Sequence, residues 1–253
     1  MAKTADGSKV LTGAAGCLLA VSLVLAGCSD GSDEVVAQPG ASGQSQQDSS
    51  DTEARALDRS STNPAWSRFA AADPAAAIME VEQYGTLEEM TAASSSVVLG
   101  SVRRVELGRS FGSDPNTQVR YVTVFVESGE VLAGGQPQLT EDGLIRVEFA
   151  LGPDATDEES AARAVSELQP LEAGEPTVFF LRHKAEEAAN EGRPELADTE
   201  RGWYRTVNAA GLVTFNEGKA DVTMYTSQPD GAPVVAAIEE VDAQAFVSRV
   251  AAN

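Results

Sequence analysis

The feature that most constrains the fold of this chain is an N-terminal quarter that offers almost nothing for a folded core. Lys3 and Lys9 precede an apolar run, Val10–Ala26, which is the layout of a secretory signal peptide. The tract that follows is mainly Ser, Gly, Gln, Asp, Glu and Ala, and cannot bury enough apolar surface to offset the entropy of ordering. We therefore expect three parts: a signal peptide at residues 1–27, a disordered tether at 28–62 and a globular domain at 63–253.

The end of the apolar run, Leu25-Ala26-Gly27-Cys28, resembles the lipobox of bacterial lipoproteins. In that family a diacylglyceryl group is attached to the cysteine and the leader is cleaved before it, so the resemblance implies a lipid on Cys28. A single transmembrane anchor is the alternative, but the run is short for a hydrocarbon layer of about 30 Å. Two acyl chains anchor a protein stably, so we expect it at the extracytoplasmic face of the cell membrane.

Charge and cysteine content exclude several classes of function. The net charge is −21, and the few cations are scattered, whereas a nucleic-acid site needs clustered Lys and Arg; we expect no nucleic-acid partner. Cys17 falls within the expected signal peptide, so the globular domain has no thiol for disulfides, nucleophilic catalysis or zinc. No Gly-rich phosphate loop is present either. We predict no cofactor and no metal.

Three helices are indicated by the residues at their starts. Thr86 and Glu89 have the spacing of a capping box, which predicts a short helix over 87–93. An acidic turn after Asp157 predicts a second helix up to Leu168, because carboxylates favour the positive end of a helix dipole. The third is expected after Asp242. The Ala-rich stretch before residue 90 is also typical of a helix.

Segments rich in β-branched and aromatic residues, several of them alternating with polar ones, predict the strands. They are 97–102, 118–126, 145–151, 177–181, 203–207 and 212–215, with 222–225 as a short edge. There is no internal repeat and no regular βαβ alternation. The pattern therefore predicts a mostly β, α+β fold: a small, mostly antiparallel barrel with flanking short helices.

Three of these strands carry hydrophobic motifs with glycines, which together form one signature. It consists of V-V-L-G-S-V at 97–102, V-T-V-F-V at 122–126 running on to V-L-A-G at 131–134, and G-E-P-T-V-F-F-L at 174–181. Together with Trp203-Tyr204 it resembles uncharacterised bacterial envelope proteins that have an OB-like barrel, related in topology to netrin and tissue-inhibitor modules. The resemblance covers about Thr86 to Phe215. It implies a barrel that serves as a platform for ligands or partners.

One known mechanism of the tissue inhibitors does not carry over to this chain. In those proteins the N-terminal cysteine chelates the zinc of the target protease. Here Cys28 is expected to be acylated and separated from the barrel by the tether. The resemblance therefore implies a fold and not an inhibitor.

The sharpest catalytic hypothesis is a serine hydrolase. Gly108-Arg109-Ser110-Phe111-Gly112 matches the G-x-S-x-G pattern, and the one histidine, His183, follows it with aspartates between. That motif needs a helix directly after the serine, whereas Ser113-Asp114-Pro115-Asn116 favours a turn. We prefer a hairpin loop between the first two strands at this position.

Two other groups of residues suggest binding chemistry. The carboxylates Asp154, Asp157, Glu158 and Glu159 lie close in sequence, but they lack a calcium-loop pattern, so a solvated helix start is the preferred interpretation. Trp203 and Tyr204 are adjacent in a strand, so they face opposite sides and one belongs to the core. A carboxylate pair of the glycosidase type is not singled out.

The sequence thus favours a non-enzymatic, lipid-anchored envelope protein whose tether presents a β-barrel to an envelope protein, peptide or glycan. Two alternatives stay open. One is an envelope serine hydrolase that uses Ser110 and His183. The other is a structural accessory subunit of an envelope complex.

Overall fold

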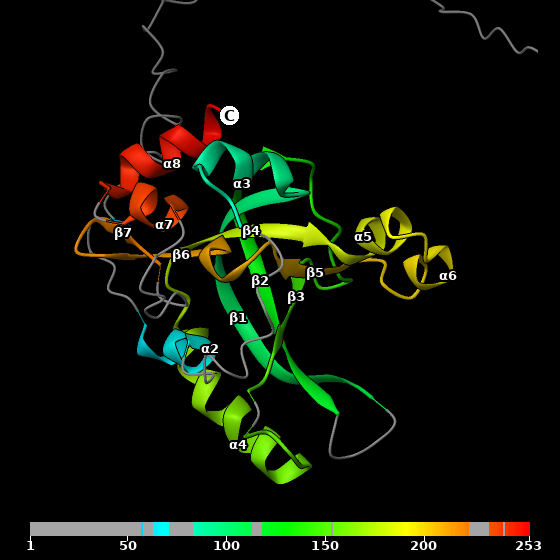
Figure 1. Ribbon diagram of the computed structural model, residues 1–253. Coiled ribbons are helices and arrows are strands. Elements are labelled where there is room, and N and C mark those ends of the chain that lie inside the picture. The colour runs from blue at the N-terminus through cyan, green and yellow to red at the C-terminus, as the bar shows by residue number, and fades with distance from the viewer. Residues whose placement is uncertain are drawn as a thin grey trace, which may run out of the picture. The chain divides into compact units, whose positions relative to one another are not determined.

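The computed structural model describes residue 57 and residues 63–70, 83–112, 118–152, 154–222, 233–239 and 241–253. The expected signal peptide, Cys28 and all of the expected tether except Leu57 lie outside these ranges. The described chain has the predicted α+β class, with a seven-stranded mixed sheet and short helices (Figure 1). In the described ranges, no helix combines the length and apolar character needed to cross a membrane.

The six main predicted strands are confirmed, and the first two extend much further than their hydrophobic cores. The strands are β1 (Ser96–Phe111), β2 (Val119–Gly134), β3 (Ile145–Ala150), β4 (Thr177–His183), β5 (Trp203–Thr206), β6 (Leu212–Asn216) and β7 (Lys219–Asp221). The predicted edge strand at 222–225 is wrong at its first residue, because β7 ends before Val222; residues 223–225 lie outside the described ranges.

The pairing of the strands follows an order that returns to its start. The sheet order is β1-β2-β3-β5-β4-β6-β7, and β1 also pairs with β4. All pairs are antiparallel except β3 with β5, which is parallel, so the sheet is mixed. The long helix α4 (Glu158–Leu168) lies between β3 and β4 in the chain and packs near β1. The parallel pair places Trp203 of β5 beside Arg146 of β3 and Tyr204 beside Val147.

Short helices cover two regions of the sheet. With the helix over 157–168 now placed as α4, the others are η1 (Pro64–Trp66), α2 (Ser67–Ala70), α3 (Leu87–Ala93), η2 (Gln169–Ala173), α5 (Lys184–Asn190), α6 (Pro194–Ala197), η3 (Ala209–Gly211), α7 (Pro233–Ile238) and α8 (Ala243–Ala251). In Figure 1, α3, α7 and α8 lie together beside β6 and β7, and α5 and α6 extend from the end of β4. The Ala-rich stretch is not one continuous helix, since residues 83–86 are not helical.

The predicted helix caps are present, with one difference. The Glu89 amide donates to the Thr86 hydroxyl at 3.1 Å, as expected, but the Glu89 carboxylate accepts from the Gly85 amide and not from Thr86. The side chains of Asp157 and Asp242 each accept a backbone N–H of the first helical turn. These caps satisfy amides that have no partner within their own helix.

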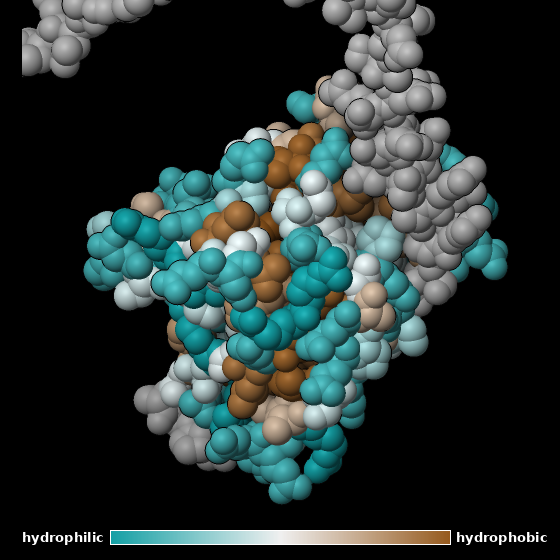
Figure 2. All heavy atoms as spheres, turned by 180° about the vertical axis from the view of Figure 1, so that it is seen from behind, coloured by the Kyte–Doolittle hydropathy of each residue, from teal (hydrophilic) through white to brown (hydrophobic). Residues whose placement is uncertain are grey.

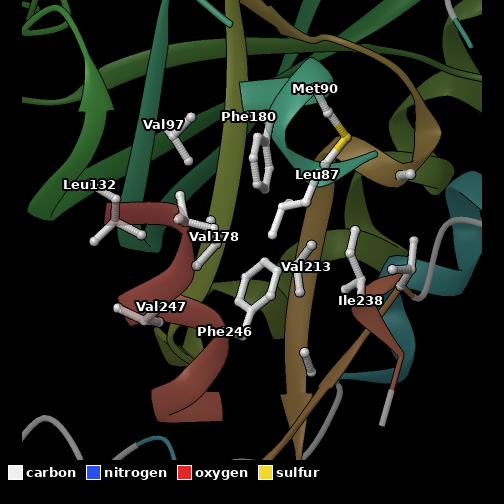
Figure 3. Close-up of a cluster of buried hydrophobic side chains, with 14 of the residues drawn as sticks. Leu87, Met90, Val97, Leu132, Val178, Phe180, Val213, Ile238, Phe246 and Val247 are labelled. Carbon is white, nitrogen blue, oxygen red and sulfur yellow. The ribbon is translucent and has the colours of Figure 1, made fainter. Parts of the chain in front are cut away.

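Two hydrophobic clusters lie on opposite sides of strand β4, which is buried on both faces. Phe179 and Leu181 point into a cluster that includes Trp66 and the inward residues of β1, β2 and β3. Phe180 and Val178 point into the other cluster, shown in Figure 3, between the sheet and helices α3, α7 and α8. The continuous apolar run of β4 is the sequence signature of such a doubly covered strand.

Gly100, the glycine of the V-V-L-G-S-V motif, is explained by a close approach of two strands. A Cβ at this position would lie 2.5 Å from the Glu127 carbonyl oxygen of β2. Backbone cannot yield as a flexible side chain can, so only glycine fits without displacing β2. The glycine in the motif therefore serves the packing of β1 against β2.

Candidate functional site

A concave surface of about 740 Å³ lies on the outer face of the β1–β2–β3 sheet, the face turned away from the Trp66 cluster. The residues that line it come from these three strands, from the loop before β3 and from the start of β5. They are Arg104, Glu106, Leu107, Gly108, Arg109, Thr123, Phe125, Leu139, Thr140, Glu141, Asp142, Arg146 and Trp203. The lining thus combines arginine, aromatic, aliphatic and acidic side chains.

Four of these residues form an arginine–aromatic row across the sheet. Arg104 opposes Phe125, Phe125 opposes Arg146, and Arg146 opposes Trp203 in the strand register. The Arg104 guanidinium lies 4.0 Å from the Phe125 ring centroid, and that of Arg146 lies 4.5 Å from the Trp203 ring centroid. Cation–π contacts of this length are attractive and hold the guanidinium groups flat against the rings.

A β-bulge in β1 brings Arg109 to the same face. Leu107 opposes Val122 and Ser110 opposes Arg120, so Gly108 and Arg109 together oppose the single residue between them on β2. The extra residue changes which side chains point outward, and a bulge commonly re-aims a side chain in this way. Arg109 then lies 4.1 Å from the Trp203 ring centroid.

Arg109 belongs to a cluster of four charged side chains around Glu148, here called the Glu148 cluster. Glu148 is on β3, and its side chain is fully buried although it is charged. Arg109 binds it through two hydrogen bonds of 2.7 and 2.5 Å, and Lys184 donates to it at 2.7 Å. Arg109 also donates two bonds to Glu200, at 3.1 and 2.8 Å. A buried carboxylate persists only with such close partners.

The pKa values in the Glu148 cluster follow from burial opposed by pairing. Burial acts to raise the pKa of Glu148, but the hydrogen bonds from Arg109 and Lys184 outweigh it, so that its pKa lies below the ordinary value. Burial likewise acts to lower the pKa of Arg109, and the two carboxylates reverse this to a raised pKa. Glu148 and Arg109 are therefore both charged at neutral pH.

Tyr121, beside this cluster, also has a shifted pKa. Burial raises the pKa of its hydroxyl, and the charge of Glu148 adds to this effect. The Phe111 ring meets the Tyr121 ring edge-on, with 5.4 Å between centroids. Tyr121 is thus a neutral, packed neighbour of the cluster.

Arg146 differs from the other two arginines of the concave surface because it has no acidic partner. Arg104 pairs with Glu106 at 2.7 Å and with Asp142 at 3.0 Å, and Arg109 is paired as described above. Within the described ranges, no hydrogen bond or ion pair joins the Arg146 guanidinium to another residue, and its Nε atom is buried. Among the described residues, the contact of its guanidinium that remains is the cation–π contact with the Trp203 ring.

The backbone around Arg146 leaves room for its guanidinium. Gly202 has φ +71°, and a Cβ there would lie 3.0 Å from the Arg146 Nη2 atom. The loop before β3 is fixed nearby, because the Gln138 amide donates to the Tyr204 hydroxyl at 2.8 Å. The site is therefore built by backbone conformation as well as by side chains.

The surface seen in Figure 2 shows apolar residues as separate patches among hydrophilic ones. The large exposed apolar side chains of the described ranges are Leu107, Phe111, Val119, Leu139 and Leu196. Two of these, Leu107 and Leu139, line the concave surface.

No protein-family model, curated protein or solved structure matches this chain. The geometry of the concave surface thus provides the basis for a functional proposal.

The structure places the two residues of the hydrolase hypothesis in separate surroundings. Ser110 lies within β1, paired with Arg120, so the expectation of a loop at Gly108–Phe111 is wrong. The His183 ring stacks on Tyr204, and its Nε2 atom accepts the Gly202 amide at 3.2 Å. That bond occupies the lone pair a general base would use. No described contact joins Ser110 to His183.

The acidic residues near α4 have structural partners. Asp157 caps the helix, as expected, and Asp154 pairs with Arg68 at 2.6 Å. Among the described residues, no group of three or more His, Cys, Asp or Glu side chains is arranged to hold a metal ion. The carboxylates Glu148 and Glu200 of the Glu148 cluster are both bound by Arg109.

The residues of the site were only partly visible in the sequence. Trp203 was a candidate, and the structure confirms that it and Tyr204 face opposite sides, with Tyr204 in the core. Arg146 and Glu148 stand at the polar positions of the alternating strand Ile145–Ala150, a pattern that by itself predicts side chains facing away from the core. The buried state of Glu148 could not be read from that alternation, because the residues that cover it come from β1 and from the segment after β4.

Proposed function

We propose that this protein is a lipid-anchored envelope protein that binds a partner, peptide or glycan at the concave surface and has no catalytic activity. The observation that carries the binding role is the concave surface itself, with an arginine–aromatic row whose Arg146 lacks an acidic partner. The proposed address rests on the sequence: the resemblance of Leu25-Ala26-Gly27-Cys28 to a lipobox supports a domain held on a tether outside the cytoplasmic membrane.

The proposal includes the finer fold, an OB-like barrel. The pairings that run from β1 through β2, β3, β5 and β4 back to β1 support it, as does the position of α4 between β3 and β4. OB barrels bind their ligands on the face of strands 2 and 3, flanked by loops. The concave surface occupies the corresponding part of this sheet, which is an argument from analogy of fold.

A non-catalytic role agrees with the local chemistry. Glu148 and Arg109, whose pKa values are shifted in the direction that favours the charged form, are held in ion pairs and are not free to exchange protons with a ligand. The single histidine is engaged by Gly202. A structural accessory subunit remains the alternative, in which the same surface would contact a permanent partner.

The anchoring is tested by Cys28→Ala in the full chain expressed in a bacterium with a lipoprotein pathway. We expect the wild-type chain to be cleaved before Cys28, to carry a diacylglyceryl adduct by mass spectrometry and to sediment with membranes. The variant should lack the adduct and should not be cleaved at this site. Cys17→Ala is the matched control, because it removes a thiol that the mature protein does not keep. An uncleaved, unmodified wild-type chain would contradict the proposed address.

The binding surface is tested by a photo-crosslinking amino acid placed at Leu139 in cells. Leu139 is 50% exposed and lines the concave surface, whereas Leu196 is 37% exposed on α6 and lies outside it. We expect a discrete adduct from position 139 and none from position 196. Equal crosslinking at the two positions, or none at position 139, would argue against this surface as the binding site.

A further inference from the structure

Arg146 has an unusual environment for an arginine in a chain with a net charge of −21. Among the described lysines and arginines, only Arg120 shares its lack of a hydrogen-bonded or ion-paired side-chain partner. Arg120 does not line the concave surface, whereas Arg146 does. The Arg146 guanidinium thus has no acceptor among the described residues, and at a concave surface a ligand can supply one.

The orientation of Arg146 suits it to bind a planar anion. Its guanidinium lies against the Trp203 ring, which restrains its rotation without using its N–H donors. The five donors of a guanidinium match a carboxylate in a bidentate arrangement. Because the ring contact already orders the side chain, little further entropy is lost when an anion binds.

The surrounding charges limit the ligand to a single negative charge at this point. Glu106, Glu141 and Asp142 line the same surface, and Arg104 is already paired with two of them. A polyanion would meet these carboxylates and be repelled. A lone carboxylate presents one charge, which the Arg146 guanidinium can offset, so acidic polysaccharides and phosphate chains fit this surface less well.

The apolar part of the lining defines what must lie next to that carboxylate. Leu107 and Leu139 line the concave surface and expose 41% and 50% of their surface, whereas Phe125 is already buried beneath the Arg104 guanidinium. A ligand gains most from this surface if an apolar group covers these side chains while its carboxylate reaches Arg146. The last residue of a peptide combines the two features when its side chain is aliphatic.

We propose that the concave surface binds the carboxyl terminus of a peptide that ends in an aliphatic residue, with Arg146 as the residue that holds the terminal carboxylate. This inference rests on the proposed binding function and names the ligand class of that same surface. Trp203 positions Arg146, and Gly202 leaves its guanidinium the space to reach the ligand.

The test measures binding of two probes to the full chain in detergent micelles by isothermal titration calorimetry. The probes are N-acetyl-Ala-Ala-Leu with a free carboxylate and the same peptide with a C-terminal amide. We expect the acid to bind and amidation to weaken binding by about ten- to a hundredfold, the effect of losing a charged hydrogen-bond partner. Arg146→Met should weaken the acid to the same extent.

The decisive comparison is between the two changes. If the carboxylate binds Arg146, the amide should bind wild type and Arg146→Met equally, so that the two losses are not additive. Arg146→Lys should keep part of the affinity, since it retains the charge without the planar fork. Arg120→Met is the matched control: it removes the same charge from an arginine outside the surface and should leave both affinities unchanged.

Several results would overturn the inference. These are equal binding of acid and amide, an unchanged affinity in Arg146→Met, an equal loss in Arg120→Met, or no binding of the acid at millimolar concentration. A crosslinked adduct at Leu139 together with any of these would leave the binding surface in place and remove only the peptide carboxylate as its ligand. If neither a crosslinked adduct at Leu139 nor binding of the acid is found, the concave surface is also ruled out as the binding site.

Discussion

Phe180→Ala should destabilise the domain by about 3–5 kcal/mol, the range for removing a buried phenylalanine and leaving a cavity. Phe180 is fully buried on β4 and lies with Leu87 and Met90 of α3 in the cluster of Figure 3. This is a large part of the 5–15 kcal/mol that stabilises a typical domain. The measurement is urea unfolding of the full chain followed by far-ultraviolet circular dichroism.

The control for this change is Leu196→Ala, in which an exposed side chain on the short helix α6 is removed. We expect a change within about 0.5 kcal/mol, the usual range for surface substitutions. Phe180→Leu keeps much of the buried volume and should fall between the two, so that a graded series remains measurable if Phe180→Ala does not fold. A loss in Phe180→Ala no larger than in the control would show that α3, α7 and α8 do not pack on β4 as described.

The hydrophobic cluster around Trp66 can be predicted from the sequence more easily than the cluster around Phe180. The strand patterns at 97–102, 145–151 and 177–181 identify residues that face inward, and the caps at Thr86, Asp157 and Asp242 locate helix starts. These signals are local, because each depends on residues only a few positions apart. The α+β class follows from them.

Other features depend on contacts between segments far apart in the chain. The parallel pairing of β3 with β5 brings Trp203 beside Arg146, and no local pattern indicates it. Helix α5 was not predicted, although its Lys-Ala-Glu-Glu-Ala-Ala sequence has high helix propensity, because it follows β4 without a side-chain cap. The sequence predicts a loop at Gly108–Phe111, whereas β1 continues through these residues with a bulge at Gly108 and Arg109. The pairing with β2 that keeps them in the strand cannot be read from local residues.

Arg109→Met should destabilise the domain by about 3 kcal/mol at pH 7. The side chain of Glu148 is fully buried, and removal of one partner leaves it with Lys184 alone. Breaking a buried ion pair typically costs about 3–5 kcal/mol, and the remaining lysine places the expected loss at the lower end. Arg103→Met is the matched control, because Arg103 pairs with Glu127 at the surface, where such a pair contributes about 1 kcal/mol or less.

The effect of Arg109→Met should depend on pH in a direction set by Glu148. Its pKa in the folded wild type lies below the unfolded value of about 4.3, so its contribution is present above that value and is lost as pH falls through the folded pKa. In the variant, burial is opposed only by Lys184, so the pKa of Glu148 rises and protonation begins at higher pH. The stability difference between wild type and variant should therefore shrink from pH 7 to pH 3.

Urea unfolding of both proteins between pH 3 and pH 8 measures this dependence, and Glu148→Gln in each background identifies its source. The glutamine carries no charge, so Arg109→Met should cost less beside it, and that smaller loss should vary little with pH. The two substitutions are expected to be strongly non-additive, since they act on one buried pair. A loss in Arg109→Met that stays constant over the whole pH range would show that packing of the arginine against Trp203, and not its charge, stabilises the outer face of the sheet.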